Sequence, residues 1–307
     1  MFKAFKERRP WVAAAFALVL SPALAMAYLG RGALAIGYLI GEVAATLLAY
    51  GIPIDTIAGA DREMVALIAQ SGVRLVGAVH GYILAGRLDE RVPSAWFARW
   101  YSLIGLFILA PLLFALAFRS FLFEPYSIPS GSMLPTLQVG DYVWVSKYAY
   151  GYSRFSFPLD LSGPKGRWLA KTPERGDVVV FRRAADLPEI YLKRIVGMPG
   201  ETVQMKDGVL HIDGAPVGYR QTDDYLDTAT DPPERVTQFT ETLPNGVSYA
   251  VLDRIAGGVA DNTALFEVPP DTFFVMGDNR DNALDSRFPS VGMVPLENLL
   301  GRMETIY

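Results

Sequence analysis

The pattern of apolar and polar positions along the chain changes at about residue 123. Before that point, three apolar runs are long enough to cross a bilayer as helices, and they cover residues 11–29, 33–52 and 103–123. A fourth run, 64–85, is ambiguous because Arg74 and His80 lie inside it, and ionisable side chains are costly in lipid unless they face protein or the surface. The pattern therefore predicts a multi-span α-helical membrane region over residues 1–123.

Basic residues flank these runs and predict an orientation. The clusters are Lys3, Lys6, Arg8 and Arg9 at the N-terminus, and Arg87, Arg91 and Arg99 within 86–100. By the positive-inside rule both clusters belong in the cytoplasm. An even number of spans therefore separates them. One further span, at 103–123, then places residue 124 outside. Three spans satisfy this count, with 64–85 at the interface or against the bundle, whereas four would place the N-terminus outside. The first run has a second interpretation as a cleaved secretory signal, because Ala25-Met26-Ala27 resembles a cleavage site.

After residue 124, short apolar runs alternate with turn signals and no long 3.6-residue period is present. Runs rich in β-branched and aromatic residues predict strands at about 141–146, 177–181, 191–196, 203–205, 209–212, 239–243, 247–252 and 273–276. Asn245-Gly246 predicts a hairpin turn between two of them. We expect a mainly β extracytoplasmic domain over residues 124–307, a barrel or sandwich with hairpin insertions, the largest at about 202–270.

Composition excludes several kinds of chemistry. The formal charge of −4 gives no reason to expect nucleic acid binding. The chain has no cysteine, which excludes disulfides, thiol nucleophiles and cysteine-based zinc sites. Two histidines, His80 and His211, are too few for a three-histidine metal site. Acid–base chemistry therefore falls mainly to Lys, Asp, Glu or Tyr.

A candidate nucleophile lies just after the last apolar run. Residues 124–137 hold Ser130 and Ser132 around a glycine and between Pro129 and Pro135. A serine fixed in such a turn outside a membrane is where a hydrolase can hold its nucleophile. The same composition is also typical of a linker that leaves the membrane.

Lys193 is the candidate base, because a serine hydroxyl needs a proton acceptor and neither histidine is well placed. An ordinary lysine has a pKa of about 10.4, so only about one in 2,500 is neutral at pH 7. Alternation in the strand Tyr191–Val196 sends Lys193 to the face of Tyr191 and Ile195. Burial on that face lowers a lysine pKa enough to make a usable base. An edge-strand lysine that blocks aggregation has the same pattern.

Taken in order, the motifs of the second half resemble those of bacterial type I signal peptidases. They are Ile128-Pro-Ser-Gly-Ser-Met-Leu-Pro-Thr-Leu137, Gly140-Asp141 through Lys147-Tyr-Ala-Tyr-Gly151, Arg175-Gly-Asp-Val-Val-Val-Phe181, Tyr191-Leu-Lys-Arg194 with Gly197-Met-Pro-Gly200, and Gly277-Asp-Asn-Arg-Asp-Asn282 with Asp285-Ser-Arg287. Five motifs in this order, over most of residues 124–300, make the resemblance specific.

The resemblance implies a role for each matching position. Ser132 would attack the scissile carbonyl, Lys193 would act as general base, and Ser130 would donate to the oxyanion together with the Ser132 N–H. Tyr191 would help to bury the lysine. The matching residues that brace the site are Gly277, Asp278, Arg194, Asp285 and Arg287. Those that line shallow pockets for small side chains are Ile128, Met133, Leu137 and Leu192. The substrate would bind as an extended strand.

Two departures from the family pattern stand out. Ala283 occupies the position where the family usually has a serine that hydrogen-bonds the lysine. Three groups are the alternatives for the hydrogen bond to Lys193 that this serine makes in the family: Tyr191, a water molecule or Ser286. The membrane half is also longer than the usual one or two spans.

The sequence therefore predicts a membrane-anchored serine endopeptidase with a Ser132–Lys193 dyad. It would remove signal peptides from exported preproteins at the outer face of a bacterial cytoplasmic membrane, with the preprotein and the lipid bilayer as partners and no metal or organic cofactor. One alternative is a specialised leader peptidase for a single pilin-type or conjugation substrate. Another is a catalytically silent membrane scaffold, which Ala283 favours.

Overall fold

The computed structural model describes residues 9–51, 62–88, 95–157, 166–183, 189–228, 230 and 232–306. The chain forms two compact units, Met1–Ala115 and Leu116–Tyr307. The basic residues Lys3, Lys6, Arg8 and Arg91, on which the predicted orientation depends, lie outside the described residues.

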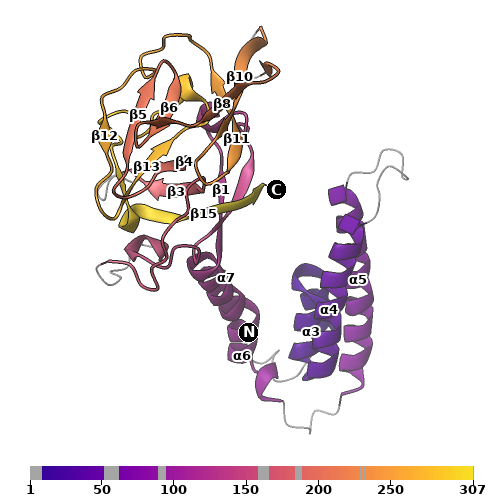
Figure 1. Cartoon of the computed structure of the whole chain (residues 1–307). Coiled ribbons are helices and arrows are strands. Elements are labelled where there is room, and N and C mark those ends of the chain that lie inside the picture. Colours follow the sequence, from indigo (N-terminus) through magenta and orange to yellow (C-terminus); the bar gives the residue numbers. More distant parts are fainter. Residues whose placement is uncertain are drawn as a thin grey trace. The chain divides into compact units, whose positions relative to one another are not determined.

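The first unit is helical (Figure 1). Its elements are α2 (Pro10–Ala15), η1 (Phe16–Leu20), α3 (Pro22–Tyr28), α4 (Gly32–Gly51), α5 (Arg62–Gly86), η3 (Trp96–Ala98), α6 (Trp100–Ile104), η4 (Gly105–Leu109) and α7 (Ala110–Phe121), the last of which continues into the second unit. Helices α3, α4 and α5 lie side by side (Figure 1).

The first apolar run forms a helical hairpin, where the sequence pattern predicted one span over 11–29. Ser21 has an extended backbone (φ −163°, ψ 141°), and its side chain accepts a hydrogen bond from Ala23 N–H as the N-cap of α3. Pro22 fits the first turn of a helix and cannot continue the preceding one. The rings of Phe16 and Tyr28 meet edge to face at 5.3 Å, so α3 folds back along α2 and η1.

The ambiguous run 64–85 is one continuous helix, α5. Its Gly77 and Gly81 face the hairpin, and a Cβ at Gly77 would lie 2.4 Å from the Cβ of Pro22, so only glycine allows this approach. His80 Nδ1 lies 3.0 Å from the hydroxyl of Tyr38 in α4, which gives this polar group a partner inside the helical unit. Among the described helices, two are long and apolar enough to cross a membrane, at Met64–Gly86 and Trp100–Phe121, and Gly32–Leu48 is a shorter apolar helix.

The second unit is built on an antiparallel sheet in the order β1-β2-β15-β3-β4-β13-β14. The strands are β1 (Phe123–Ser127), β2 (Tyr142–Ser146), β3 (Val178–Arg182), β4 (Ile190–Gly197), β13 (Thr272–Met276), β14 (Val294–Pro295) and β15 (Leu299–Ile306). The prediction of a mainly β domain is confirmed.

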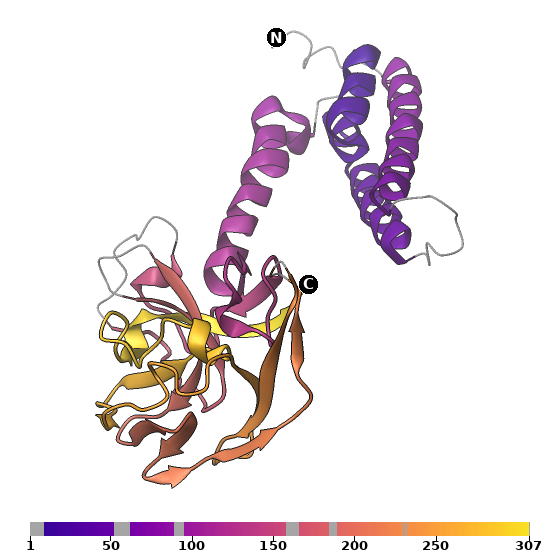
Figure 2. The ribbon, with the colours of Figure 1, turned by 90° about the horizontal axis from the view of Figure 1, so that it is seen from above.

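Two smaller sheets lie between β4 and β13 in the sequence. One has the order β12-β5-β6-β7 and the other β11-β10-β8, with β9 also paired to β10. Their bounds are β5 (Thr202–Lys206), β6 (Val209–Ile212), β7 (Ala215–Pro216), β8 (Gly218–Gln221), β9 (Tyr225–Asp227), β10 (Glu234–Thr242), β11 (Ser248–Asp253) and β12 (Phe266–Glu267). The long hairpin of β10 and β11, in orange, runs along one side of this unit (Figure 2).

Strand β3 is buried on both faces, because successive side chains in a strand point to opposite sides. Val178 and Val180 belong to one core cluster, which also holds Ile128, Met133 and Leu137. Val179 and Phe181 belong to another, with Ile195 of β4. The segment that carries the candidate nucleophile is therefore fixed to one face of the large sheet.

Candidate active site

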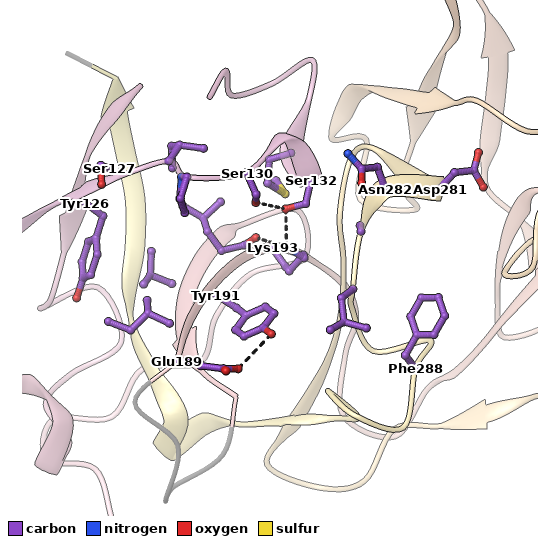
Figure 3. Close-up of a pocket in the computed structure, with 18 residues that line it drawn as sticks. Tyr126, Ser127, Ser130, Ser132, Glu189, Tyr191, Lys193, Asp281, Asn282 and Phe288 are labelled. Carbon is purple, nitrogen blue, oxygen red and sulfur yellow. Dashed lines mark hydrogen bonds between the residues drawn. The ribbon is translucent and has the colours of Figure 1, made fainter. Parts of the chain in front are cut away.

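Ser132 lies in a short 3₁₀ turn, Gly131–Met133, that follows β1. The connection is fixed at its start, where Ile128 N–H donates to Asp141 O at 2.8 Å and Gly140 N–H donates to Ile128 O at 2.9 Å. Met133 is buried in the core. Ser132 thereby lines a cavity, with its hydroxyl beside the hydroxyl of Ser130 and the amine of Lys193 (Figure 3).

Lys193 approaches this hydroxyl from β4, which lies between β3 and β13. Its Nζ is 2.8 Å from Ser132 Oγ and donates to the carbonyl of Leu192 at 2.9 Å (Figure 3). The lysine is only 3% exposed. This burial lowers the pKa of Lys193 to about 8, although the nearby carboxylates of Asp285 and Asp278 act in the opposite direction. At pH 7 about one amine in ten is then neutral, which makes Lys193 a usable base.

Two further side chains surround the reacting atoms. The Ser130 hydroxyl lies 3.4 Å from Ser132 Oγ, on the solvent side of the turn. The centroid of the Tyr191 ring lies 5.7 Å from Lys193 Nζ, and the ring also packs against Phe181 of β3. Tyr191 therefore shields the amine on the face of β4 that alternation predicted.

The Arg194–Asp278 pair links β4 to the loop after β13. Arg194 donates from Nε and Nη2 to the two carboxylate oxygens of Asp278, at 2.9 and 2.7 Å, and from Nη1 to the Gly176 carbonyl at 2.9 Å. The hydroxyl of Thr136 also donates to Asp278, at 2.5 Å. Thr136, which the sequence reasoning did not single out, thus ties the serine segment to the same carboxylate.

The Asp285–Arg287 pair holds the other side of that loop. Arg287 donates from Nε and Nη2 to Asp285 at 2.9 and 2.8 Å, and Asp285 accepts a bond from Gly277 N–H at 3.0 Å. Arg287 also donates to the Arg280 carbonyl at 2.6 Å. Both pairs are nearly excluded from solvent, where removal of one partner is strongly destabilising.

Gly277 is the point of closest approach between the loop and the dyad. A Cβ there would lie 2.3 Å from the Cβ of Ala283 and 2.6 Å from the Ser132 carbonyl oxygen. Asn279 closes the contact, because its N–H donates to Ser132 O at 3.1 Å and its side chain donates to Gly131 O at 2.9 Å. Asn279 lies inside a motif noted in the sequence, but its partner is more than a hundred residues away.

Ala283 has no side-chain hydrogen bond to offer Lys193. Of the three alternatives for replacing it, Ser286 accepts a bond from Val275 N–H at 3.0 Å and so holds β13. The second partner of the amine is instead the Leu192 carbonyl. No sequence pattern indicated this contact, since it depends on the rotamer of Lys193 itself.

The cavity above the dyad has a volume of about 690 Å³. Of the four residues predicted for the substrate pocket, Ile128, Met133 and Leu192 line this cavity, whereas Leu137 does not and is fully buried in the core beside Met133. Leu137 therefore acts on the pocket through packing, not as its wall. Further lining residues that the sequence did not single out are Tyr126, Glu189, Asn282, Leu284 and Phe288.

Comparisons with known proteins agree on one family. The family model described as "Signal peptidase, peptidase S26" matches residues 100–307. Signal peptidase I of Rickettsia typhi is 37% identical over 201 residues, which is 63% of this chain and 75% of the relative. Signal peptidase I of Rickettsia canadensis is 38% identical over 201 residues, covering 63% and 74%. The crystal structure of a signal peptidase I from Enterococcus faecalis V583 is 26% identical, covers 44% of this chain and 98% of that one, and has a TM-score of 0.26.

Proposed function

The chain belongs to the signal peptidase family, peptidase S26, and we propose that its cleavage of signal peptides as a serine endopeptidase is carried out by a Ser132–Lys193 dyad. The observation that supports this assignment is the 2.8 Å separation of Lys193 Nζ and Ser132 Oγ, combined with the burial of the lysine. Among the described residues, no group of three metal-ligating side chains is present.

The neutral amine of Lys193 takes the proton of Ser132 as Oγ attacks the scissile carbonyl carbon. The tetrahedral oxyanion that forms is stabilised by the Ser130 hydroxyl and the Ser132 N–H. Removal of one such donor raises the activation free energy by roughly 2.7–4 kcal/mol. The Lys193 ammonium then returns a proton to the leaving amine. Water, deprotonated by Lys193, hydrolyses the acyl-enzyme and restores the dyad.

The substrate binds as an extended strand between the segment that leaves β1 and the start of β4. Ser127 and Ser130 lie on one side of the cavity and Glu189 and Tyr191 on the other (Figure 3). Backbone hydrogen bonds to such edges supply affinity, and pockets under alternate side chains supply specificity. The apolar walls around Ser132 favour small residues such as alanine before the scissile bond, since larger ones clash.

The first unit anchors this domain at the outer face of a bacterial cytoplasmic membrane. We place the membrane spans at α4, α5 and the Trp100–Phe121 segment, with the α2–α3 hairpin entering the bilayer and returning to the same side. The 20 residues of α4 reach about 30 Å, which matches a bilayer core. The last span ends at Phe121, so Ser132 follows within a short connection and acts close to the bilayer surface.

The test is cleavage of a preprotein with an Ala-X-Ala site by the purified full chain in detergent. Lys193→Ala is expected to lower kcat by roughly 10²–10⁴-fold, the range for loss of a general base, and Ser132→Ala, which removes the nucleophile, by at least as much. Lys171→Ala, which removes an exposed lysine, is the matched control and keeps wild-type activity. Cleavage by Lys193→Ala at the wild-type rate would overturn the dyad.

A further inference from the structure

The substrate cavity has two walls that lie on different sides of the dyad. One is the segment that leaves β1, and the other is the loop after β13. Figure 3 shows Tyr126 and Ser127 on one side of Lys193, and Asn282 and Phe288 on the other. The sheet order agrees, because β13 adjoins β4 on the side away from β3. The two walls therefore meet different parts of an extended substrate.

The first wall takes the residues that precede the scissile bond. In the function proposed above, the small residue before this bond enters the apolar pocket beside Ser132. Ile128, from the segment after β1, and Leu192, from β4, line that pocket. Residues further before the bond lie between the same two segments. The residues that follow the bond then leave past the dyad, along the loop after β13.

Alternation of side chains identifies which of these following residues faces the protein. Successive side chains in an extended strand point to opposite faces. The residue just before the bond points into the cavity, so the first residue after it points away and the second points in again. The side chain of that second residue therefore meets the wall formed by Ala283, Leu284 and Phe288.

This wall presents apolar surface on a fixed backbone. Leu284 is 40% exposed and Phe288 is half-buried. Phe288 N–H donates to Asp285 O at 3.0 Å, and Phe288 O accepts from the N–H groups of Val291 and Gly292 at 3.0 Å each. The side chain of Leu284 is thus held open to the cavity by an ordered loop, and an apolar side chain of the substrate would cover it.

Asp281 is the charged residue at this end of the cavity. Its Oδ2 accepts hydrogen bonds from the N–H groups of Arg254 and Ile255, at 2.7 and 2.9 Å. These bonds fix the carboxylate in the wall. An acidic side chain that follows the scissile bond would meet the same sign of charge, so the wall favours an apolar side chain over an acidic one.

We propose that Leu284 and Phe288 form a subsite for an apolar side chain on the second residue after the scissile bond. The enzyme then selects its preproteins by the start of the mature chain as well as by the residues before the bond. This inference rests on the proposed function, because it takes Ser132 as the point where the bond is cut.

The experiment compares peptides that share one Ala-X-Ala sequence before the bond and differ only at the second residue after it. The purified full chain in detergent is expected to cleave the leucine peptide with a kcat/KM about tenfold above the serine peptide, the lower end of the range for an added apolar group in a pocket. The aspartate peptide should be the poorest. The same exchange at the first residue after the bond should change kcat/KM little.

Leu284→Ser is expected to reduce the preference for leucine over serine from about tenfold to roughly threefold or less, since it removes half of the subsite. The readout is a ratio, so a general loss of active enzyme does not change it. Leu265→Ser, which replaces a leucine that is 54% exposed outside the cavity, is the matched control and keeps the full preference.

A second variant tests the subsite by a gain. Leu284→Lys places a cation on the wall, and kcat/KM for the aspartate peptide relative to the serine peptide should rise about twofold to fivefold, as for an exposed ion pair. A damaged protein would not show this rise.

Four outcomes would overturn the proposal. They are equal cleavage of the leucine and serine peptides by wild type, a preference that depends on the first residue instead of the second, an undiminished preference in Leu284→Ser, and no rise for aspartate in Leu284→Lys. Each is measured with the dyad intact. Failure of the subsite is therefore distinguishable from failure of the dyad, which the Lys193→Ala variant tests.

Discussion

Lys193 is held away from water on a central strand while its amine contacts the Ser132 hydroxyl and the Leu192 carbonyl. Burial disfavours the charged form and lowers its pKa to about 8. The amine accepts the serine proton only when it is neutral. If Lys193 is the general base, as we propose, the pH dependence of kcat/KM follows the titration of this amine.

We expect kcat/KM to rise about tenfold per pH unit below pH 8 and to level off above it, because the neutral fraction of Lys193 follows that course. The measurement is cleavage of a peptide substrate without ionisable side chains between pH 6 and 10. A profile that is flat below pH 8, or that rises only near pH 10, would contradict the assignment of a buried lysine as base.

Ala283 offers a second test at the residue scale. Ala283→Ser introduces a hydroxyl beside Gly277 and the lysine side chain, and one added hydrogen bond of about 1 kcal/mol would raise kcat by roughly fivefold through better positioning of the amine. Ala283→Val, which adds volume without a hydrogen bond, should not raise it. A rate unchanged in Ala283→Ser would mean that the Leu192 carbonyl alone positions Lys193.

The residue types of the site were predictable from the sequence, but its long-range contacts were not. Ser132 and Lys193 stand out locally, one in a constrained turn and the other in an apolar strand. The bonds of Thr136 to Asp278 and of Asn279 to the serine turn join residues more than 140 positions apart. No periodicity or turn signal carries that information, because it arises from the way the chain folds in three dimensions.

At the scale of elements, the hairpin of β10 and β11 supplies a buried anion to the loop after β13. Glu241 of β10 is fully buried and accepts hydrogen bonds from Arg280, at 2.7 Å, and from the Tyr249 hydroxyl of β11. The Tyr249 ring lies 3.9 Å from the guanidinium of Arg194. The hairpin is therefore bonded to the same loop that holds Asp278 and Gly277.

Glu241→Gln is expected to lower the free energy of unfolding by about 3–5 kcal/mol, because it leaves the buried charge of Arg280 uncompensated. It should also lower kcat, since the loop that contacts Ser132 loses its support. Urea denaturation followed by fluorescence measures the first effect. The double variant Glu241→Leu/Arg280→Met removes both charges and should recover most of the stability, and equal losses in the single and double variants would refute this explanation.

Local patterns predicted several strands of the large sheet but not its order. The runs that became β2, β3, β4 and β13 were recognised from their β-branched and aromatic residues. Strand β15 was not predicted, yet it pairs with both β2 and β3 near the middle of the sheet. Hydropathy likewise did not reveal the hairpin at Ser21, although a proline after an N-cap residue inside an apolar run is a recognisable signal of a helix start.

At the scale of the whole molecule, the span arrangement proposed from the hairpin uses different segments from the arrangement predicted from the sequence, but both place the catalytic domain on the same side of the membrane. Three spans were predicted at 11–29, 33–52 and 103–123. If the hairpin returns to its side of entry, α4, α5 and Trp100–Phe121 also make three spans. The number is odd in both arrangements, so both place residue 124 onward on the opposite side of the membrane from the N-terminus. The two arrangements differ only in the side of the membrane on which they place the connections before and after α4.

Cysteine labelling distinguishes these arrangements, because the natural chain contains no cysteine. The full-length variants are Arg31→Cys, Ala58→Cys and Val92→Cys, each treated in intact cells with a membrane-impermeant maleimide. The hairpin arrangement predicts labelling of Ala58→Cys from outside and protection of the other two until the cells are opened. The earlier arrangement predicts the reverse for the first two variants, with labelling of Arg31→Cys and protection of Ala58→Cys. That result would mean that the 11–29 segment crosses the bilayer and that α5 does not, whatever the charges around them suggest.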